Sequence, residues 1–200
     1  CEEYAILLMK TSESIKKADP NAVIFGMSLA GVGARFPEGV FEILKKNNKL
    51  DAFDYLTYHP YALNPDSSYP AVEALRQLTQ SYNPDIQLYQ GECGCPSILE
   101  WTHALSRYPW TEYSQAKWVL RRMAGDGARG IRTSVFTIID LRYWNMLQSF
   151  GLIRSNLVYD IIYKRPSYYG VQHMAGFFND NVKPAGLLAC ESNSPRAITA

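Results

Sequence analysis

Residues 86–94 read IQLYQGECG, an apolar run that ends in an acidic residue flanked by small ones. The turn signal at residues 83–85 (NPD) precedes it, so we predict a buried strand over residues 86–92. A carboxylate at the end of such a strand is costly unless it is paired or functional, and glycines allow another molecule to approach closely. Glu92 is therefore the first candidate for a catalytic carboxylate. A structural ion pair or helix cap is the alternative.

Three more strand-like runs are found on either side of this one, at residues 22–28, 53–58 and 131–139. Helix-like segments separate the strands. The first covers residues 3–18, and its predicted apolar face consists of Tyr4, Leu7, Leu8 and Ile15. The second covers residues 38–47, with Val40, Phe41 and Leu44 inward. A third begins at Pro70, a fourth is capped by Thr111 and broken by Gly127, and the last covers residues 166–178. Strands that alternate with helices indicate parallel pairing. Their continuous apolar character indicates that both faces of the sheet are covered.

Two α/β architectures fit this alternation: an open doubly wound sheet and a (β/α)8 TIM barrel. The run at residues 29–33 (LAGVG) lacks the full dinucleotide-binding pattern, which disfavours the first. Four strands cannot close a barrel, and a whole barrel needs roughly 250 residues. We therefore predict the C-terminal half of a barrel, strands five to eight, over residues 1–178. The missing N-terminal half is its expected partner, and residues 179–200 form a tail or the start of an accessory element.

The bulk properties exclude several classes of function. The formal net charge of +1 argues against a nucleic-acid partner, and no apolar run approaches roughly 18 residues, so no membrane-spanning segment is expected. The spacing of Cys93 and Cys95 differs from the usual zinc pairs, and we interpret both as ordinary thiols. We expect no metal and no cofactor.

In parallel barrels the active site lies at the C-terminal ends of the strands. The residues delivered there, besides Glu92, are Ser28, His59, Tyr61 and Asp140, with Tyr143 and Trp144 just beyond. Polar groups that converge between aromatic walls are typical of a sugar-processing pocket, so we expect these six residues to bind the substrate. Because adjacent strands lie roughly 5 Å apart, His59 or Tyr61 could donate a hydrogen bond that orients Glu92. Asp140 could be a second acid, a structural carboxylate or a ligand for a sugar hydroxyl, and we favour the last two roles. Trp144 is either a platform for sugars or part of the core.

The order of these motifs resembles the C-terminal half of clan A glycoside hydrolases, of the family 39 and family 5 type, over about residues 3–175. Residues 4–22 are similar to the helix after strand four, and residues 54–61 to the end of strand six. Residues 88–94 are similar to the nucleophile segment of strand seven, and residues 136–140 with Trp144 to strand eight.

The resemblance implies a retaining hydrolase of β-linked glycosides or polysaccharides, with Glu92 as nucleophile and a second carboxyl group roughly 5–5.5 Å away as acid/base. In this clan the acid/base follows an asparagine, and no Asn-Glu pair occurs in the 200 residues. We therefore expect the acid/base upstream of Cys1 and the chain alone to be nearly inactive. The expected substrate is an oligo- or polysaccharide, and the expected location is extracellular or periplasmic.

Two other functions stay open. A carbohydrate-binding relative without catalysis would lack the upstream Asn-Glu pair. A lyase or aldolase would need a lysine or a metal cluster at the strand ends, and no lysine occurs at the four predicted ends.

Overall fold

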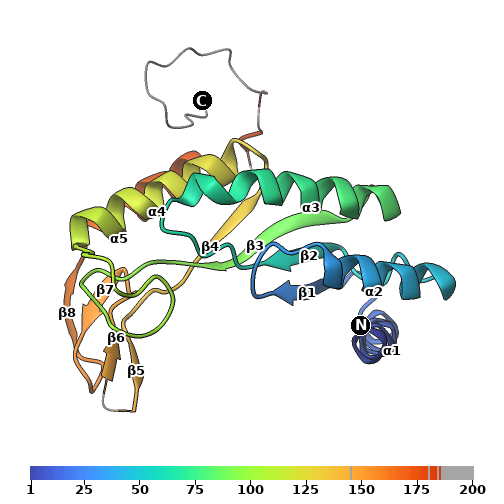
Figure 1. Ribbon diagram of the computed structural model, residues 1–200, viewed down its shortest axis with the longest axis horizontal. Coiled ribbons are helices and arrows are strands. Elements are labelled where there is room, and N and C mark those ends of the chain that lie inside the picture. Colours follow the sequence, from blue (N-terminus) through green and yellow to red (C-terminus); the bar gives the residue numbers. More distant parts are fainter. Residues whose placement is uncertain (145, 180, 184, 186–200) are drawn as a thin grey trace. The chain divides into compact units, whose positions relative to one another are not determined.

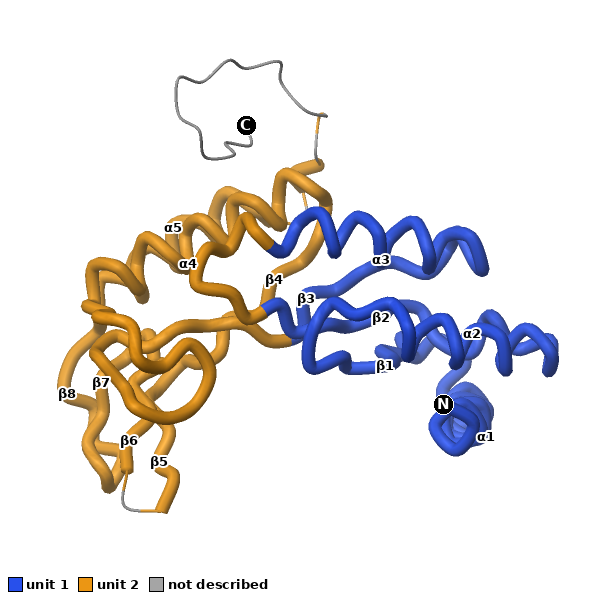
Figure 2. Tube along the Cα trace, viewed as in Figure 1, with its two compact units in different colours: residues 1–60, 68–91 blue, residues 61–67, 92–200 orange. Residues whose placement is uncertain are grey.

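The computed structural model describes residues 1–144, 146–179, 181–183 and 185. The chain forms two compact units (Figure 2): unit 1 consists of residues 1–60 and 68–91, and unit 2 consists of residues 61–67 and 92–200. Most of the tail predicted at residues 179–200 lies outside the described residues.

Unit 1 alternates helices and strands as the sequence predicts (Figure 1). Its elements are α1 (Glu2–Ala18), β1 (Phe25–Leu29), α2 (Arg35–Lys46), β2 (Tyr55–Tyr58), α3 (Tyr69–Tyr82) and β3 (Gln87–Cys93), whose last two residues belong to unit 2. β1 pairs in parallel with β2, and β2 pairs in parallel with β3, which sets Leu56 opposite Leu88. The predicted parallel pairing of these three strands is confirmed.

The core of unit 1 is built on α2. Val40, Phe41 and Leu44 are spaced one and three residues apart, so they share one face of the helix, and all three are fully buried. The Phe41 ring lies 5.9 Å from the ring of Phe53 and stacks on the ring of Tyr82 at 4.9 Å. Aromatic contacts therefore join α2 to the residue that precedes β2 and to the end of α3.

The buried face of α1 differs from the predicted one. The structure buries Ala5, Leu8 and Ser12, whereas Leu7 is 63% exposed. The three buried residues are spaced three and four positions apart, so they share one face of the helix, and α1 packs against α2. Two of them are small, which lets helices approach closely, and a search for large apolar residues overlooks such a face.

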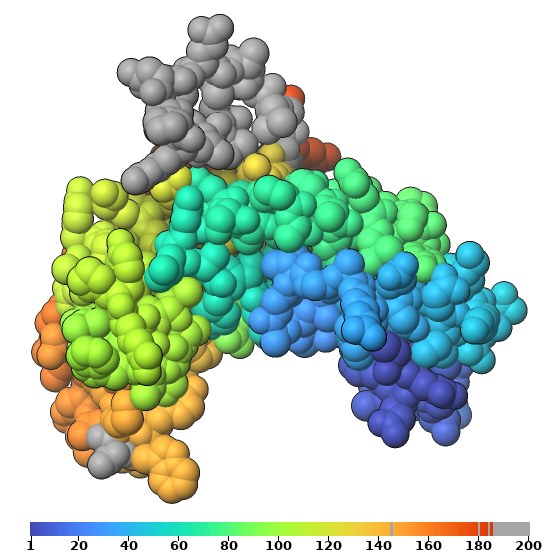
Figure 3. All heavy atoms as spheres, in the orientation of Figure 1, coloured from blue at the N-terminus to red at the C-terminus, as the bar shows by residue number. Residues whose placement is uncertain are grey.

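Unit 2 contains two long helices and five short strands in its described part. They are α4 (Glu112–Gly127), β4 (Arg132–Val135), β5 (Leu141–Tyr143), β6 (Met146–Gln148), β7 (Ile153–Ser155), β8 (Ile161–Lys164) and α5 (Pro166–Phe177). Thr111 caps α4 as predicted, in a reciprocal pair of hydrogen bonds with Ser114. α4 and α5 pack side by side (Figure 1). In Figure 3, residues 94–111, between β3 and α4, cover much of the visible face of this unit.

The strand predicted over residues 131–139 is shorter in the structure. β4 ends at Val135 and is the fourth strand in the sheet order β1-β2-β3-β4, while Ile139 forms an isolated parallel bridge with Ile153. The segment that follows had no predicted structure and forms two antiparallel ribbons, β5-β6 and β7-β8. Strands of three or four residues are too short to give a readable alternation of polar and apolar positions.

None of the helices in the described ranges is both long enough and apolar enough to cross a membrane.

Candidate active site

Glu92 lies one residue before the end of β3, and its side chain is partly exposed. The phenol of Tyr61 donates a hydrogen bond of 2.7 Å to Glu92 Oε1. Both residues belong to unit 2, although 31 positions separate them in the sequence. Of the two donors that the sequence suggested for Glu92, Tyr61 is the one that the structure places on the carboxylate.

Tyr61 is held by a hydrophobic cluster of unit 2, and its ring packs against the buried residues Cys93, Cys95, Trp110, Trp118 and Val119. Burial raises the pKa of Tyr61 well above its ordinary value, and the hydrogen bond to Glu92 raises that pKa further. The phenol therefore keeps its proton at neutral pH and remains a donor to the carboxylate. The Tyr61 hydroxyl bonds Oε1 of Glu92, and the other carboxylate oxygen, Oε2, takes no part in this hydrogen bond.

Ser28 and His59 belong to unit 1. Thr57 Oγ1 donates to Ser28 Oγ over 3.1 Å. A Cβ atom built on Gly91 would lie 3.3 Å from His59 Nε2, so glycine at this position lets the imidazole lie close to the backbone of β3. The predicted contacts of Ser28 and His59 with a substrate stay predictions.

Backbone strain accompanies Ser28. The φ angles of Met27 and Ser28 are 71° and 39°, in the left-handed region that side-chain-bearing residues rarely adopt. The register of β1 on β2 also shifts between Gly26 and Leu29. Such irregularities concentrate near functional sites, where they redirect a side chain.

Asp140 is fully buried and forms a two-pronged ion pair with Arg165, which is also buried. Arg165 Nη1 donates to Oδ1 over 2.6 Å, and Nη2 donates to Oδ2 over 2.9 Å. The backbone N–H of Gly151 also donates to Oδ1, and that of Ser155 to Oδ2. Of the three roles considered for Asp140, this geometry supports the structural one.

Tyr143 and Trp144 lie at the tip of the β5-β6 ribbon. Trp144 is 95% exposed, so it is not part of the core. The stacking of a sugar ring on its indole stays a prediction. The Tyr143 ring lies 5.0 Å from the ring of His103, which comes from the loop before α4. Nothing in the sequence predicts this contact, because His103 lies in a loop without helical or strand periodicity.

Glu100 is a buried carboxylate that sequence reasoning missed. Its Oε1 accepts hydrogen bonds from the N–H and the hydroxyl of Ser149, over 2.5 and 2.6 Å, and its Oε2 lies 3.6 Å from His103 Nδ1. Glu100 thereby ties the loop at residues 94–111 to the residue that follows β6. The one sequence signal for a buried Glu100 is its position beside apolar residues, in the run ILEW at residues 98–101.

Cys93 and Cys95 are buried in the hydrophobic cluster, and no disulfide joins them. Burial raises the pKa of Cys93 to about 12 and that of Cys95 well above its ordinary value. Within the part of the chain that the structure describes, no three histidine, cysteine or acidic side chains come together as metal ligands would. Burial and the raised pKa values are typical of unreactive thiols in a core.

Comparison with known proteins shows a similar fold but no family. No protein-family model and no curated protein matches the chain. Its fold is similar to that of an FMN-binding β-glucuronidase from Facaelibacterium prausnitzii L2-6, with a TM-score of 0.58 and 17% identity over 87% of this chain and 26% of that one. The chain shares the fold of part of a glycoside hydrolase. This chain therefore spans only about a quarter of the length of that enzyme.

Two further structures are weaker matches. One is a Ruminococcus gnavus β-glucuronidase in complex with D-glucuronic acid, with a TM-score of 0.40 and 13% identity over 85% of this chain and 36% of that one. The other is an active-site mutant of a Rhizomucor miehei β-1,3-glucanosyltransferase in complex with laminaritriose, with a TM-score of 0.38 and 14% identity over 61% of this chain and 52% of that one. Scores this low carry no argument about the fold.

Proposed function

We propose that this chain carries the catalytic nucleophile, Glu92, of a retaining β-glycoside hydrolase. The observation that carries the proposal is the hydrogen bond from Tyr61 to a carboxylate at the end of a strand in a parallel sheet. The similarity of the fold to part of a β-glucuronidase supports it. As part of the same proposal, the chain forms strands five to eight of a (β/α)8 barrel.

The chemistry follows from the geometry around Glu92. Tyr61 holds Oε1, so Oε2 is the oxygen that attacks the anomeric carbon. A bond forms between Oε2 and that carbon while the bond to the leaving oxygen breaks, and the leaving oxygen takes a proton from an acid. Water then attacks the glycosyl-enzyme and releases Glu92, with the same acid group now acting as base.

The acid/base is proposed to come from sequence that these 200 residues do not contain, because the Asn-Glu pair of the clan is absent from them. Ser28, His59, Tyr143 and Trp144 are proposed to contact the sugar. Because an enzyme reaches polysaccharides outside the cytoplasm, we also propose an extracellular or periplasmic location.

Mechanism-based labelling tests the role of Glu92. A 2-deoxy-2-fluoro β-glycoside with a good leaving group should add one sugar per molecule to the full-length protein, on the peptide that contains Glu92. Glu92→Gln should abolish the label, whereas Glu3→Gln, a change on an exposed part of α1, should not. A label on another carboxylate would remove Glu92 from its role. Sugar binding without labelling or turnover would favour a non-catalytic carbohydrate-binding protein.

A further inference from the structure

The segment that carries Tyr61 belongs to unit 2, although the chain on both sides of it belongs to unit 1. Residues 61–67 are part of unit 2, whereas residues 1–60 and 68–91 form unit 1. The hydrogen bond from Tyr61 to Glu92 therefore lies wholly within unit 2. The contacts that fix this segment to unit 2 also set the position of the donor relative to the carboxylate.

Two buried side chains of α4 hold the segment by its backbone. Trp118 Nε1 donates to the carbonyl oxygen of Ala62, the residue after Tyr61, over 2.9 Å. Arg122 Nη2 donates to the carbonyl oxygen of Pro65 over 2.8 Å. Trp118 and Arg122 are four positions apart, so they lie on the same face of the helix, and they are only 5% and 1% exposed. The segment is thus tied to α4 at two points.

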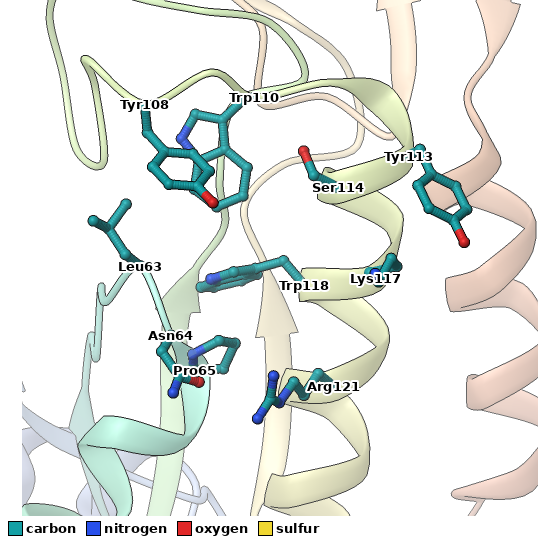
Figure 4. Close-up of a pocket in the computed structure, with 10 residues that line it drawn as sticks. All are labelled: Leu63, Asn64, Pro65, Tyr108, Trp110, Tyr113, Ser114, Lys117, Trp118 and Arg121. Carbon is teal, nitrogen blue, oxygen red and sulfur yellow. The ribbon is translucent and has the colours of Figure 1, made fainter. Parts of the chain in front are cut away.

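Close packing holds the segment along only part of its length. Residues 63–65 and α4 line an open pocket of about 420 Å³ (Figure 4), so these residues face a cavity on that side. Figure 4 shows the Trp118 side chain reaching from α4 toward the segment. Because packing does not fix the backbone along the pocket, more of its positioning falls to the hydrogen bonds from α4.

The two donors on α4 are themselves fixed. Arg122 Nη1 lies 3.5 Å from Asp126 Oδ1, and Thr133 Oγ1 donates to Asp126 Oδ2 over 2.8 Å. The Arg122 guanidinium carbon lies 5.8 Å from the centre of the Trp118 ring, a distance at which a cation and an aromatic ring attract each other. Such support from packed and bonded neighbours is what a group needs in order to position another side chain.

We propose that Trp118 and Arg122 are positioning residues for the reaction, which hold the backbone of residues 62–65 so that the Tyr61 hydroxyl stays on Glu92 Oε1. The inference rests on the proposed function for the role of Glu92. A misplacement of about 1 Å, caused by a change far from the chemistry, can lower a rate strongly. A tryptophan that only fills the core would affect the stability of the protein and not the Tyr61–Glu92 contact.

Trp118→Phe tests the placement of Tyr61, because it removes the N–H donor and keeps an aromatic ring. The full-length protein is labelled with 3-fluorotyrosine, and the fluorine NMR signal of Tyr61 is the one that Tyr61→Phe lacks. Glu92→Gln shows how far this signal moves when the charge of the carboxylate is lost. Trp118→Phe should move the signal, whereas Trp110→Phe should not. Trp110 is a matched control, since it is also 5% exposed in the same cluster but donates to Leu105.

Enzyme kinetics tests the consequence for the reaction. Trp118→Phe should lower kcat on an aryl glycoside roughly three- to tenfold, the loss expected for one hydrogen bond, and should leave KM unchanged. In Tyr61→Phe protein the same substitution should change kcat by less than about twofold, because Trp118 acts through a hydroxyl that is already absent. Trp110→Phe should leave kcat unchanged. Arg122→Lys, which keeps a positive charge beside Asp126, is a second variant and should also move the Tyr61 signal.

Other results would overturn the inference. One is a Tyr61 signal that neither Trp118→Phe nor Arg122→Lys moves, and another is an equal shift in Trp110→Phe, which would assign the effect to packing of the cluster. A loss of kcat that is equally large with and without the Tyr61 hydroxyl is a third. Labelling at Glu92 with an unmoved signal refutes only this inference. A signal moved by Trp118→Phe in a protein without labelling or turnover refutes only the proposed function, because the NMR measurement needs no activity.

Discussion

At the scale of single residues, the contact between Tyr61 and Glu92 is the most informative one. We expect Tyr61→Phe to lower kcat on an aryl glycoside roughly ten- to hundredfold, because it removes a hydrogen bond to a charged group. Tyr82→Phe is a matched control, since Tyr82 donates to Glu42 on the surface of unit 1, and it should leave kcat unchanged. Steady-state kinetics with equal melting temperatures for the variants is the measurement. Unchanged kcat in Tyr61→Phe would show that the phenol does not position the nucleophile.

The thiols of the hydrophobic cluster give a prediction with a defined pH dependence. The thiolate is the reactive form, and the pKa of Cys93 is raised to about 12, so at pH 8 almost none of it is present. Iodoacetamide should therefore modify exposed Cys1 in the native protein but spare Cys93 and Cys95, and should modify all three after unfolding in urea. Peptide mass spectrometry measures this. Rapid modification of Cys93 in the native protein would contradict the burial described here.

At the scale of elements, the pair Asp140–Arg165 joins the segment after β4 to the residue before α5. Asp140→Asn removes both short charge-assisted hydrogen bonds of the buried Arg165 guanidinium and leaves it, among the described carboxylates, only the 3.4 Å contact of its Nε with Glu112. The substitution should therefore lower the free energy of unfolding by roughly 3 kcal/mol. Asp51→Asn, on the surface of unit 1, should change it by less than roughly 0.5 kcal/mol. Urea unfolding checks both. A stable Asp140→Asn protein with a raised KM would instead assign Asp140 to sugar binding.

The elements also differ in how well the sequence predicts them. The faces of α2 and the capped start of α4 follow from local signals, three or four residues apart, and the structure has both. The predicted buried face of α1 was partly wrong, because Ala5 and Ser12 are buried by helix packing and not by their own hydrophobicity. The ribbons after β4 are held by pairing between short strands, which leaves no periodic pattern to read.

At the scale of the whole molecule, the prediction concerns the acid/base group, which we propose lies outside these 200 residues. Without general acid catalysis the isolated 200-residue chain should hydrolyse a methyl β-glycoside roughly 10²–10⁴-fold more slowly than a longer polypeptide that supplies the second carboxyl group. A dinitrophenyl glycoside, whose leaving group needs no proton, should narrow this gap. Comparing initial rates for the two substrates is the measurement. Equal turnover of the methyl glycoside by both proteins would place the acid within these 200 residues.

The amino-acid sequence by itself determined the alternation of strands and helices and the parallel order of the first three strands. It also determined that Glu92 lies at the end of one strand and that Tyr61 follows the neighbouring strand. These follow from hydrophobic periodicity and turn chemistry, which act over a few residues. Only the tertiary structure decided that Tyr61 is the donor to Glu92 and that Asp140 forms an ion pair with Arg165. It also brought residues 63–65 beside α4, where they line a pocket. These depend on side chains more than 20 positions apart, whose meeting is set by the packing of the core.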